Sequence, residues 1–550
     1  MSKKILFGEK AKHELKIGVD AIGDAVKITL GPRGRNVVFD RGYGGPTITN
    51  DGVSIANEIV LPDSMQNIGC MVTKGVAQKT NEAAGDGTTT SIVLMQSIVE
   101  EGMKAIKGNF WQFIKRLFSF KSLRVNAIGV KNGLEKASKI AIKALKSNSV
   151  IISSKDWMKR VAVISSESEE IGIVISDTIE KLGEDAVITV EESPVVGITS
   201  HVSQGLEFDK GFVSPYMVID KDRGEAECKD VKILVTDMKI GIVEDILPLL
   251  EETMKSGRRE LVIIAEDIIG EALQTFVVNK IRGGLTVIGI KAPGFGTRKR
   301  DYLEDIATVV GAKFVSNDLG IPLSNITLED LGSADRVVAT KDKTTIIGGH
   351  GKKEDIESRI ATAKKELEGL ESKHDQLKVQ ERIGKLSGGV AIIKVGAASE
   401  TETRYLKLKV EDAVNAVKAA IEEGIVIGGG CSLIRASESV LRGITGTLTA
   451  DEKIGFKILA KSLCAPLKNI AINAGQGDGR KIVKNVKKMY SNGGYDALAG
   501  EYVKNMFDAG IVDPLKVERC AIENAVSAGG TLLTMEVSMA ELPKDKPDMM

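Results

Sequence analysis

The strongest local signal for chemistry is a loop rich in glycine and threonine, Ala84-Gly-Asp-Gly-Thr-Thr-Thr90, which precedes an apolar helical run over 91–100. Glycines in front of a helix let the backbone curl, so that successive N–H groups converge on an anion at the positive helix end. The threonine hydroxyls add donors, and Asp86 would repel a phosphate unless a cation lay between them. The loop predicts either a phosphate site with Mg²⁺ on Asp86 or an N-cap cluster in which the threonines only cap the helix.

Three further segments place glycine turns beside polar residues: Thr29–Arg35, Thr49–Gly52 and Gly428–Gly430. The first is also consistent with a plain helix terminator, and the second with a turn that its aspartate only shapes. Asp412 lies on an amphipathic helix predicted over 410–423, where an aspartate is ordinarily a solvated surface residue. The sequence contains neither a Walker pattern nor a G-x-G-x-x-G after a strand, so a nucleotide would bind outside those two common motifs.

The elements that must position these residues change in character along the chain. Residues 9–148 have the pattern of amphipathic helices, whereas 205–350 alternate short apolar strands with helices, and a charged stretch over 352–385 predicts a pair of surface helices. Alanine-rich helices return after 389. This order predicts an α/β domain with a mainly parallel sheet, inserted into a helical domain whose two ends pack together.

Length and composition limit the classes of protein. The 550 residues predict about three to four domains. Lys+Arg 75 balances Asp+Glu 75, and this neutrality argues against a dedicated nucleic-acid binder. Five scattered cysteines and four isolated histidines form neither a disulfide framework nor a zinc site. Because the first residues lack a signal-peptide pattern and no apolar run reaches about 18–20 residues, we expect a soluble cytoplasmic protein.

Taken together, the motifs resemble those of group I chaperonins, in the order in which they occur there. The matching segments are Thr29-Leu-Gly-Pro-Arg-Gly-Arg-Asn36, Thr49-Asn-Asp-Gly52, Ala83-Ala-Gly-Asp-Gly-Thr-Thr-Thr90, Lys291-Ala-Pro-Gly-Phe-Gly296, Leu386-Ser-Gly-Gly-Val390, Val410-Glu-Asp-Ala413, Gly428-Gly-Gly430 and Gly510-Ile-Val-Asp-Pro514. The resemblance extends from the first residues to about Leu542 and is interrupted by one insertion.

The resemblance implies a multidomain α and α/β fold with a discontinuous helical equatorial ATPase domain, a small intermediate hinge domain and an α/β apical domain inserted in the middle. The implied bounds are 1–148 and 423–550 for the equatorial domain, 149–204 and 390–422 for the intermediate domain, and 205–389 for the apical domain.

The resemblance also implies an ATP site that uses Mg²⁺ and K⁺. Asp86 would hold the metal, and Asp412, assisted by Asp51, would activate the attacking water. The residues implied to line the nucleotide are Thr29, Leu30, Gly31, Pro32, Asn50, Asp86, Gly87, Thr88, Thr89, Thr90, Gly429, Asp496, Ala497, Leu498 and Asp513. Asn50 stands where some members have lysine, which affects the K⁺ contacts.

The second implied surface is apolar and would bind non-native polypeptide clients. Its residues are Phe212, Val213, Tyr216, Met217, Leu247, Leu250, Leu273, Val277 and Val278. The spacing of the last three puts them on one helical face, which alone is equally the pattern of an ordinary core. The implied partners are clients, a heptameric co-chaperonin lid that competes for the same patch, and other copies of the chain in two stacked seven-membered rings. Nucleic acid is not among them.

Four features depart from the family pattern. An aromatic and basic insertion at Phe110–Val125 has the pattern of an interfacial membrane helix or partner-binding helix, or is a tolerated loop. Asp496-Ala-Leu498 replaces Asn-Ala-Ala, an extra residue lies near Lys504, and the chain ends Pro543–Met550 without a Gly-Gly-Met tail. We therefore keep two alternatives to a folding ATPase: a ring-forming scaffold or membrane-surface binder, and a small-molecule phosphotransferase.

Overall fold

The computed structural model describes residues 3–541 apart from 41–45, 108–124, 153, 184–186, 221–222, 295–296, 317, 319, 321, 369–372 and 389. The predictions for the insertion and for the chain after Pro543 therefore lie outside the described residues, except for Val125. The chain forms two compact units. A helical unit comprises residues 1–177, 192–198 and 395–550, and an α/β unit comprises 178–191 and 199–394.

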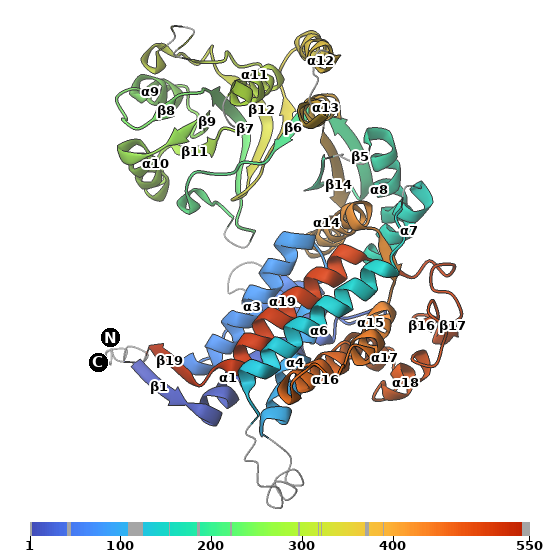
Figure 1. The fold of residues 1–550 in the computed structure, drawn as a ribbon. Helices are drawn as coiled ribbons and strands as arrows, with labels where there is room; N and C mark the ends of the chain where they lie inside the picture. The colour runs from blue at the N-terminus through green and yellow to red at the C-terminus, as the bar shows by residue number, and fades with distance from the viewer. Residues whose placement is uncertain are drawn as a thin grey trace, which may run out of the picture. The chain divides into compact units, whose positions relative to one another are not determined.

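The helical unit is built from both ends of the chain (Figure 1). Its helices are α1 (Gly8–Lys27), α2 (Gly52–Glu58), α3 (Ser64–Ala84), α4 (Thr88–Lys107), α6 (Ala127–Ser147), α7 (Lys155–Ser166), α14 (Glu400–Glu423), α15 (Cys431–Arg442), α16 (Ala450–Ser462), α17 (Ala465–Asn473), α18 (Arg480–Val486) and α19 (Leu515–Thr534). Its short strands are β1 (Lys3–Phe7), β2 (Val37–Phe39), β3 (Thr47–Thr49), β15 (Ile425–Ile427), β16 (Gly494–Asp496), β17 (Glu501–Val503), β18 (Val512–Pro514) and β19 (Val537–Glu541).

One apolar core joins the early and late helices of this unit. It contains Leu94 and Ile98 of α4, Leu134 of α6, and Ile522 and Leu533 of α19. The two ends are also linked by β1 and β19, which pair antiparallel with Lys3 opposite Glu541. These contacts confirm the prediction that the helical segments on either side of the α/β region form one body.

The α/β unit is organised around a six-stranded sheet in the order β11-β9-β7-β12-β13-β6. The strands of this unit are β6 (Gly205–Phe208), β7 (Ala226–Val235), β8 (Lys239–Ile240), β9 (Glu260–Ala265), β10 (Asp267–Ile268), β11 (Thr286–Lys291), β12 (Gly332–Ala339) and β13 (Thr344–Gly349). Its helices are η1 (Pro215–Met217), α9 (Leu247–Lys255), α10 (Gly270–Ile281), α11 (Thr297–Val310), η3 (Leu323–Asn325), α12 (Lys353–Glu368) and α13 (Lys373–Gly388).

The prediction of a mainly parallel sheet is wrong for half of these strands. β7, β9 and β11 pair in parallel, whereas β12, β13 and β6 continue the sheet antiparallel from β7. The reason is that β12 and β13 are joined by a four-residue loop, 340–343, which can close an antiparallel hairpin but cannot cross over to a parallel strand.

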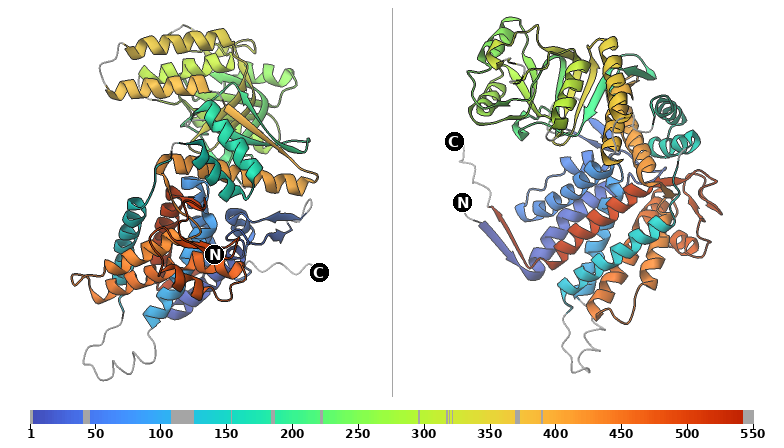
Figure 2. Two further views of the ribbon diagram at one scale, coloured as in Figure 1. Left: turned by 90° about the vertical axis from the view of Figure 1, so that its right-hand side faces the viewer. Right: turned by 45° about the horizontal axis from the view of Figure 1, so that its top comes forward.

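The predicted pair of surface helices is confirmed as α12 and α13, which lie side by side in Figure 2. Ile356 of α12 and Leu386 of α13 are buried in the core of the α/β unit. Both helices are also held by the buried Asp305 of α11, whose carboxylate accepts hydrogen bonds from Arg359 at 2.6 Å and from Arg382 at 3.0 Å.

The chain passes between the units in helix α8 (Glu169–Leu182) and in strands β4 (Val187–Glu192), β5 (Gly197–Ser203) and β14 (Val390–Gly396), which form a three-stranded sheet in the order β4-β14-β5. Among the described residues, no helix combines the length and the apolar character that a membrane span requires.

Candidate functional site

The predicted phosphate loop joins α3 to α4 and is shaped by two glycines. Gly85 ends α3 in the left-handed region with φ of 69°, and Gly87 has φ of 79°. A Cβ on Gly87 would lie 2.4 Å from the Val517 side chain, so the site requires glycine for both conformation and space. The first N–H groups of α4, at Thr88, Thr89 and Thr90, have no acceptor within the helix and are oriented as an anion site requires.

The turn before α2 lies directly against the start of α4. A Cβ on Gly52 would be 2.7 Å from the hydroxyl oxygens of both Thr88 and Thr89. Asp51 is the N-cap of α2, and its two carboxylate oxygens accept hydrogen bonds from the Val53 and Ser54 N–H groups at 3.2 and 2.8 Å. Asp51 therefore shapes its own turn as well as bringing negative charge to the loop, and the neighbouring Asn50 is half-buried.

Helix α14 carries Asp412 and packs near the loop between α3 and α4. One turn beyond Asp412, the Asn415 amide donates to the carbonyl of Gly85 at 3.4 Å. Burial raises the pKa of Asp412 well above its usual value, and the negative charges of Asp51 and Asp86 raise it further. Burial also raises the pKa of Asp86, against the opposing effects of its hydrogen bond from Gly87 N–H and the charge of Lys409. Asp412 is half-buried, so the expectation of a solvated position on this helix holds only in part.

Asp513 joins the cluster from the other end of the chain. β15 pairs with β18, which places Val426 opposite Asp513, and the chain then turns through Gly429 and Gly430 at φ of 64° and 72°. The Asp513 carboxylate accepts hydrogen bonds from both of these glycine N–H groups. Burial, together with the charge of Asp86, nevertheless raises the pKa of Asp513 to about 6.

The turn after α1 is held in place by α17. The Asn473 amide donates to the carbonyl oxygens of Lys27 and Leu30, each at 2.9 Å. Thr29 donates to the Val26 carbonyl at 2.8 Å, and Gly31 has φ of 86° with no room for a Cβ beside Ile470. Leu30 packs against a core cluster that also contains Ile427 and Ala497, so the turn that ends at Pro32 lies near both of those segments.

The segment Asp496–Leu498, which is predicted to line the nucleotide, is the least complete part of the site. Asp496 Oδ1 accepts hydrogen bonds from the N–H groups of Leu498 at 2.8 Å and Ala499 at 3.1 Å, so this oxygen is committed to its own turn. Ala497 is buried, whereas Leu498 is exposed, and its carbonyl accepts from Arg33 at 2.6 Å. The arrangement fixes the backbone of the segment and leaves only the second carboxylate oxygen of Asp496 for a ligand.

Two functional groups were missed by the sequence analysis. Lys409 is buried, donates to Glu167 at 3.0 Å, and lowers the pKa values of both Asp86 and Asp412. Glu518 of α19 is 3% exposed, accepts a hydrogen bond from Ser432, and has a second oxygen with no partner among the described residues. Burial raises the pKa of Glu518 well above its usual value, and Asp513 raises it further. Glu518 lies on the same face of α19 as the buried Leu515 and Ile522, and this helical spacing could have predicted its burial from the sequence.

The donor set fits a Mg²⁺ ion that is shared with phosphates rather than held by the protein alone. No group of three or more acidic, histidine or cysteine side chains in the described ranges is close enough to hold a metal by itself. The raised pKa values of Asp86, Asp412 and Asp513 nevertheless arise partly from mutual repulsion, which a cation at Asp86 would relieve. Mg²⁺ commonly takes one or two carboxylates and completes its shell with phosphate and water oxygens.

The predicted client residues all lie in the α/β unit but differ in exposure. Tyr216, Leu247 and Val278 are 71%, 41% and 43% exposed. Phe212, Val213, Leu273 and Val277 are partly buried. Met217 and Leu250 are buried in the core, so the expectation that they form part of an exposed rim is wrong.

The structure brings most of the client residues together. Lys280 of α10 donates to the carbonyls of Tyr216 and Val218 at 3.0 and 2.6 Å, which ties α10 to η1. α9 follows β8 and α10 follows β10, and these two strands pair in parallel. The sequence analysis missed Met254 in α9 and Ile281 in α10, which add exposed apolar surface to the same two helices.

A comparison with protein-family models gives one match that covers nearly the whole chain. The model of the TCP-1/cpn60 chaperonin family matches residues 22–541. The matched range includes every residue of the candidate site and every predicted client residue.

Proposed function

Because the chain belongs to the TCP-1/cpn60 chaperonin family, whose members are ATPases that assist protein folding, we propose that it is a group I chaperonin. In this proposal it binds non-native polypeptides on the exposed apolar residues of the α/β unit and encloses them in a ring chamber. ATP binding and hydrolysis in the helical unit drive the cycle. The group I assignment is supported by the ordered set of motifs from Thr29 to Pro514.

The observation that carries the proposal is the loop before α4, where glycines with positive φ lead into the helix and four aspartates act electrostatically on one another. Asp51, Asp86, Asp412 and Asp513 come from segments up to 462 positions apart, yet Asp86 acts electrostatically on Asp412 and Asp513, and Asp51 acts on Asp86 and Asp412. Natural structures keep such mutually repelling carboxylates close together where a cation or a reaction requires them. A glycine turn beside a helix N-terminus supplies the complementary phosphate donors.

Each residue then has a role in ATP hydrolysis. The first N–H groups of α4 and the hydroxyls of Thr88–Thr90 bind the phosphates, while the turn at Thr29–Pro32 and the Gly429 turn hold the remainder of the nucleotide. Asp86 would hold Mg²⁺, which would supply charge neutralisation when bound, and oxygens beside Asn50 would hold K⁺. Asp412 orients the attacking water and accepts its proton, a task for which a raised pKa makes it a stronger base. Asp51 assists from the start of α2.

The proposed assembly is two stacked seven-membered rings in the cytoplasm, closed by a heptameric co-chaperonin lid. Exposed apolar side chains such as Tyr216 and Ile281 suit a client of any sequence, because hydrophobic attraction is non-directional. The lid would compete for the same side chains, and this competition would release the client into the chamber.

The test combines native mass spectrometry with a refolding assay. The purified protein should have the mass of fourteen subunits, or of seven that Mg-ATP shifts, and it should recover a chemically denatured enzyme only when ATP is present. Asp412→Asn should assemble and bind the denatured enzyme but release it at least tenfold more slowly. A stable monomer that still binds ATP would overturn the chamber mechanism, and recovery without ATP would overturn the role of hydrolysis.

A further inference from the structure

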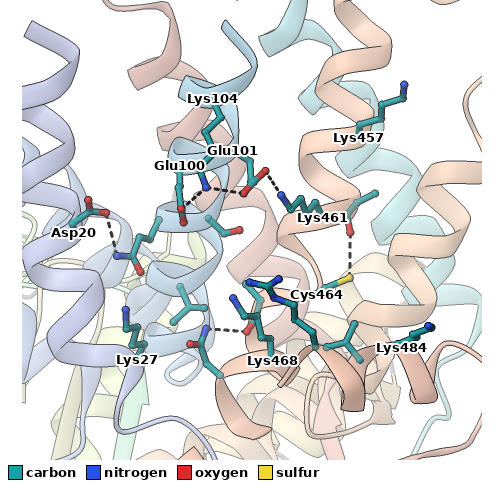
Figure 3. Close-up of a pocket in the computed structure, with 18 of the residues that line it drawn as sticks. Asp20, Lys27, Glu100, Glu101, Lys104, Lys457, Lys461, Cys464, Lys468 and Lys484 are labelled. Atoms are coloured by element: carbon teal, nitrogen blue, oxygen red, sulfur yellow. Dashed lines mark hydrogen bonds and ion pairs between the residues drawn. The ribbon is translucent and has the colours of Figure 1, made fainter. Parts of the chain in front are cut away.

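A second cavity of the helical unit is lined mainly by lysine side chains. It lies among α1, α4, α16, α17 and α18 and has a volume of about 1040 Å³ (Figure 3). Its lining contains nine cationic side chains and four carboxylates, a formal excess of five positive charges in a protein whose net charge is zero. None of the residues assigned to the nucleotide site lines this cavity.

The four carboxylates are already neutralised by neighbouring lysines. Asp20 pairs with Lys16, and Asp24 pairs with Lys27 at 2.6 Å. Lys104 lies between the other two, Glu100 and Glu101, which are 2.5 and 3.3 Å from its Nζ. All four acids lie on α1 and α4, the two helices that form one side of the cavity.

The charged side chains on the opposite side, contributed by α16, α17 and α18 with Lys487 just after it, are all cations, but Arg480 pairs with Asp478 at 3.1 Å, which lowers the unpaired excess by one. Lys461 pairs across the cavity with Glu101 at 2.5 Å. Lys457, Lys468, Lys484 and Lys487 form no ion pair with any other described residue, although the charge of Lys468 contributes to lowering the pKa of Glu100. Figure 3 shows Lys457, Lys468 and Lys484 on separate turns around the same space. Like charges around one cavity repel one another, and a bound polyanion would reduce that repulsion.

We propose that this cavity binds a linear inorganic polyphosphate. A ligand that matches this excess of positive charge within about 1040 Å³ needs a high charge per volume, and a phosphate chain supplies this better than a peptide, whose backbone takes most of the space. Eight of the nine cations are lysines, compact point charges that suit phosphate oxygens without demanding one orientation. The described lining holds no aromatic side chain, and a nucleic acid would therefore find no surface on which to stack its bases.

The experiment measures binding of sodium tripolyphosphate and of a longer linear polyphosphate to the full-length protein by calorimetry. Excess ADP is present throughout, so that the nucleotide site is filled. The test variant carries Lys468→Gln, Lys484→Gln and Lys487→Gln, and a second variant carries only the latter two. The matched control carries Lys139→Gln, Lys143→Gln and Lys146→Gln on α6, three exposed lysines that do not line the cavity.

We expect the triple variant to lose at least tenfold in affinity and the double variant to lose less, while the control stays within twofold of wild type. Wild-type affinity should fall steeply with added salt, and the triple variant should show a weaker salt dependence because fewer counterions are released. Three outcomes would overturn the proposal: no binding by wild type at low salt, equal loss in the control, or tighter binding of single-stranded RNA with the same number of phosphates.

Discussion

The two units treat a buried carboxylate in opposite ways. In the α/β unit, Asp305 is 2% exposed and is satisfied by two arginines, one from each helix of the α12–α13 pair. In the helical unit, Glu518 is buried and Asp412 and Asp513 are half-buried, and loss of solvation is the first cause that raises the pKa of each; the buried Lys409 opposes this shift at Asp412. The ion pairs of Asp305 hold two helices together. The carboxylate cluster of the helical unit carries more negative than positive charge, and such a cluster favours binding of a cation.

Exposed apolar residues occur in both units. The helical unit packs α4, α6 and α19 around one core and leaves Ile151 and Tyr490 exposed, at 82% and 92%. The α/β unit also buries a continuous core, yet it leaves Tyr216 and Ile281 more than two thirds exposed. Exposed side chains of this size cost solubility and are retained where a protein surface must bind others. Exposure alone therefore does not distinguish the two units, and the tie between α10 and η1 is what groups the exposed apolar side chains of the α/β unit.

The largest effect is expected from removing the group that acts on water. Asp412→Asn keeps the shape of the side chain but cannot accept a proton, so ATP hydrolysis should fall at least tenfold; general-base catalysis typically contributes roughly 10²–10⁴-fold. Affinity for ATP should change little, because Asp412 lies on α14 and not on the phosphate loop. Steady-state hydrolysis and equilibrium ATP binding separate the two effects. Unchanged hydrolysis would remove Asp412 from the mechanism.

The next prediction tests whether phosphate binding requires the backbone geometry of the loop at Gly87 and not charge alone. Gly87→Ala adds a Cβ that would lie 2.4 Å from Val517 at a φ of 79°, and the loop must shift. We expect at least a tenfold loss in ATP affinity. Gly75→Ala in α3 is the matched control, since its Cβ would meet nothing within 4 Å. Equal ATP affinity in the two variants would mean that the phosphates bind elsewhere.

The sequence predicted the helical and α/β character of the two units because amphipathic periods and apolar strand runs depend on local spacing. It also located the loop at Asp86 and the turn at Gly429, whose glycines have positive φ. It could not show that Asp86 acts electrostatically on Asp412, since that effect depends on how α14 packs on a segment more than 300 positions away. The exposure of Leu247 and the burial of Leu250 likewise depend on which face of α9 meets the sheet.

A smaller effect separates client binding from stability within one helix. Leu247 is 41% exposed and Leu250 is 6% exposed, and both lie in the first turn of α9. Leu247→Ser should weaken binding of a denatured client a few-fold with little change in Tm. Leu250→Ser should lower the stability of the unit by about 3 kcal/mol, because it removes core contacts and buries a hydroxyl. Thermal unfolding and client capture, measured in parallel, would distinguish the two variants. If both variants lost stability, weaker client binding by Leu247→Ser would not be evidence that Leu247 contacts the client.

The smallest effect is a pH dependence of stability that originates in the carboxylate cluster. Because the pKa of Asp513 is raised to about 6, the folded protein binds a proton there more tightly than the unfolded chain does, and this term destabilises the fold above pH 6. The destabilising effect of Asp513 on the fold should therefore decrease as pH falls from 7 towards 4. Asp513→Asn cannot ionise, although its amide oxygen can still accept from the Gly429 and Gly430 N–H groups. We expect its Tm, measured without nucleotide or Mg²⁺, to exceed that of wild type at pH 7.5 by a few degrees, and this advantage to shrink as pH falls below about 6 and to disappear near pH 4. A constant difference across this range would show that Asp513 does not titrate there, and the contrast with the satisfied Asp305 would then rest on Asp412 and Glu518 alone.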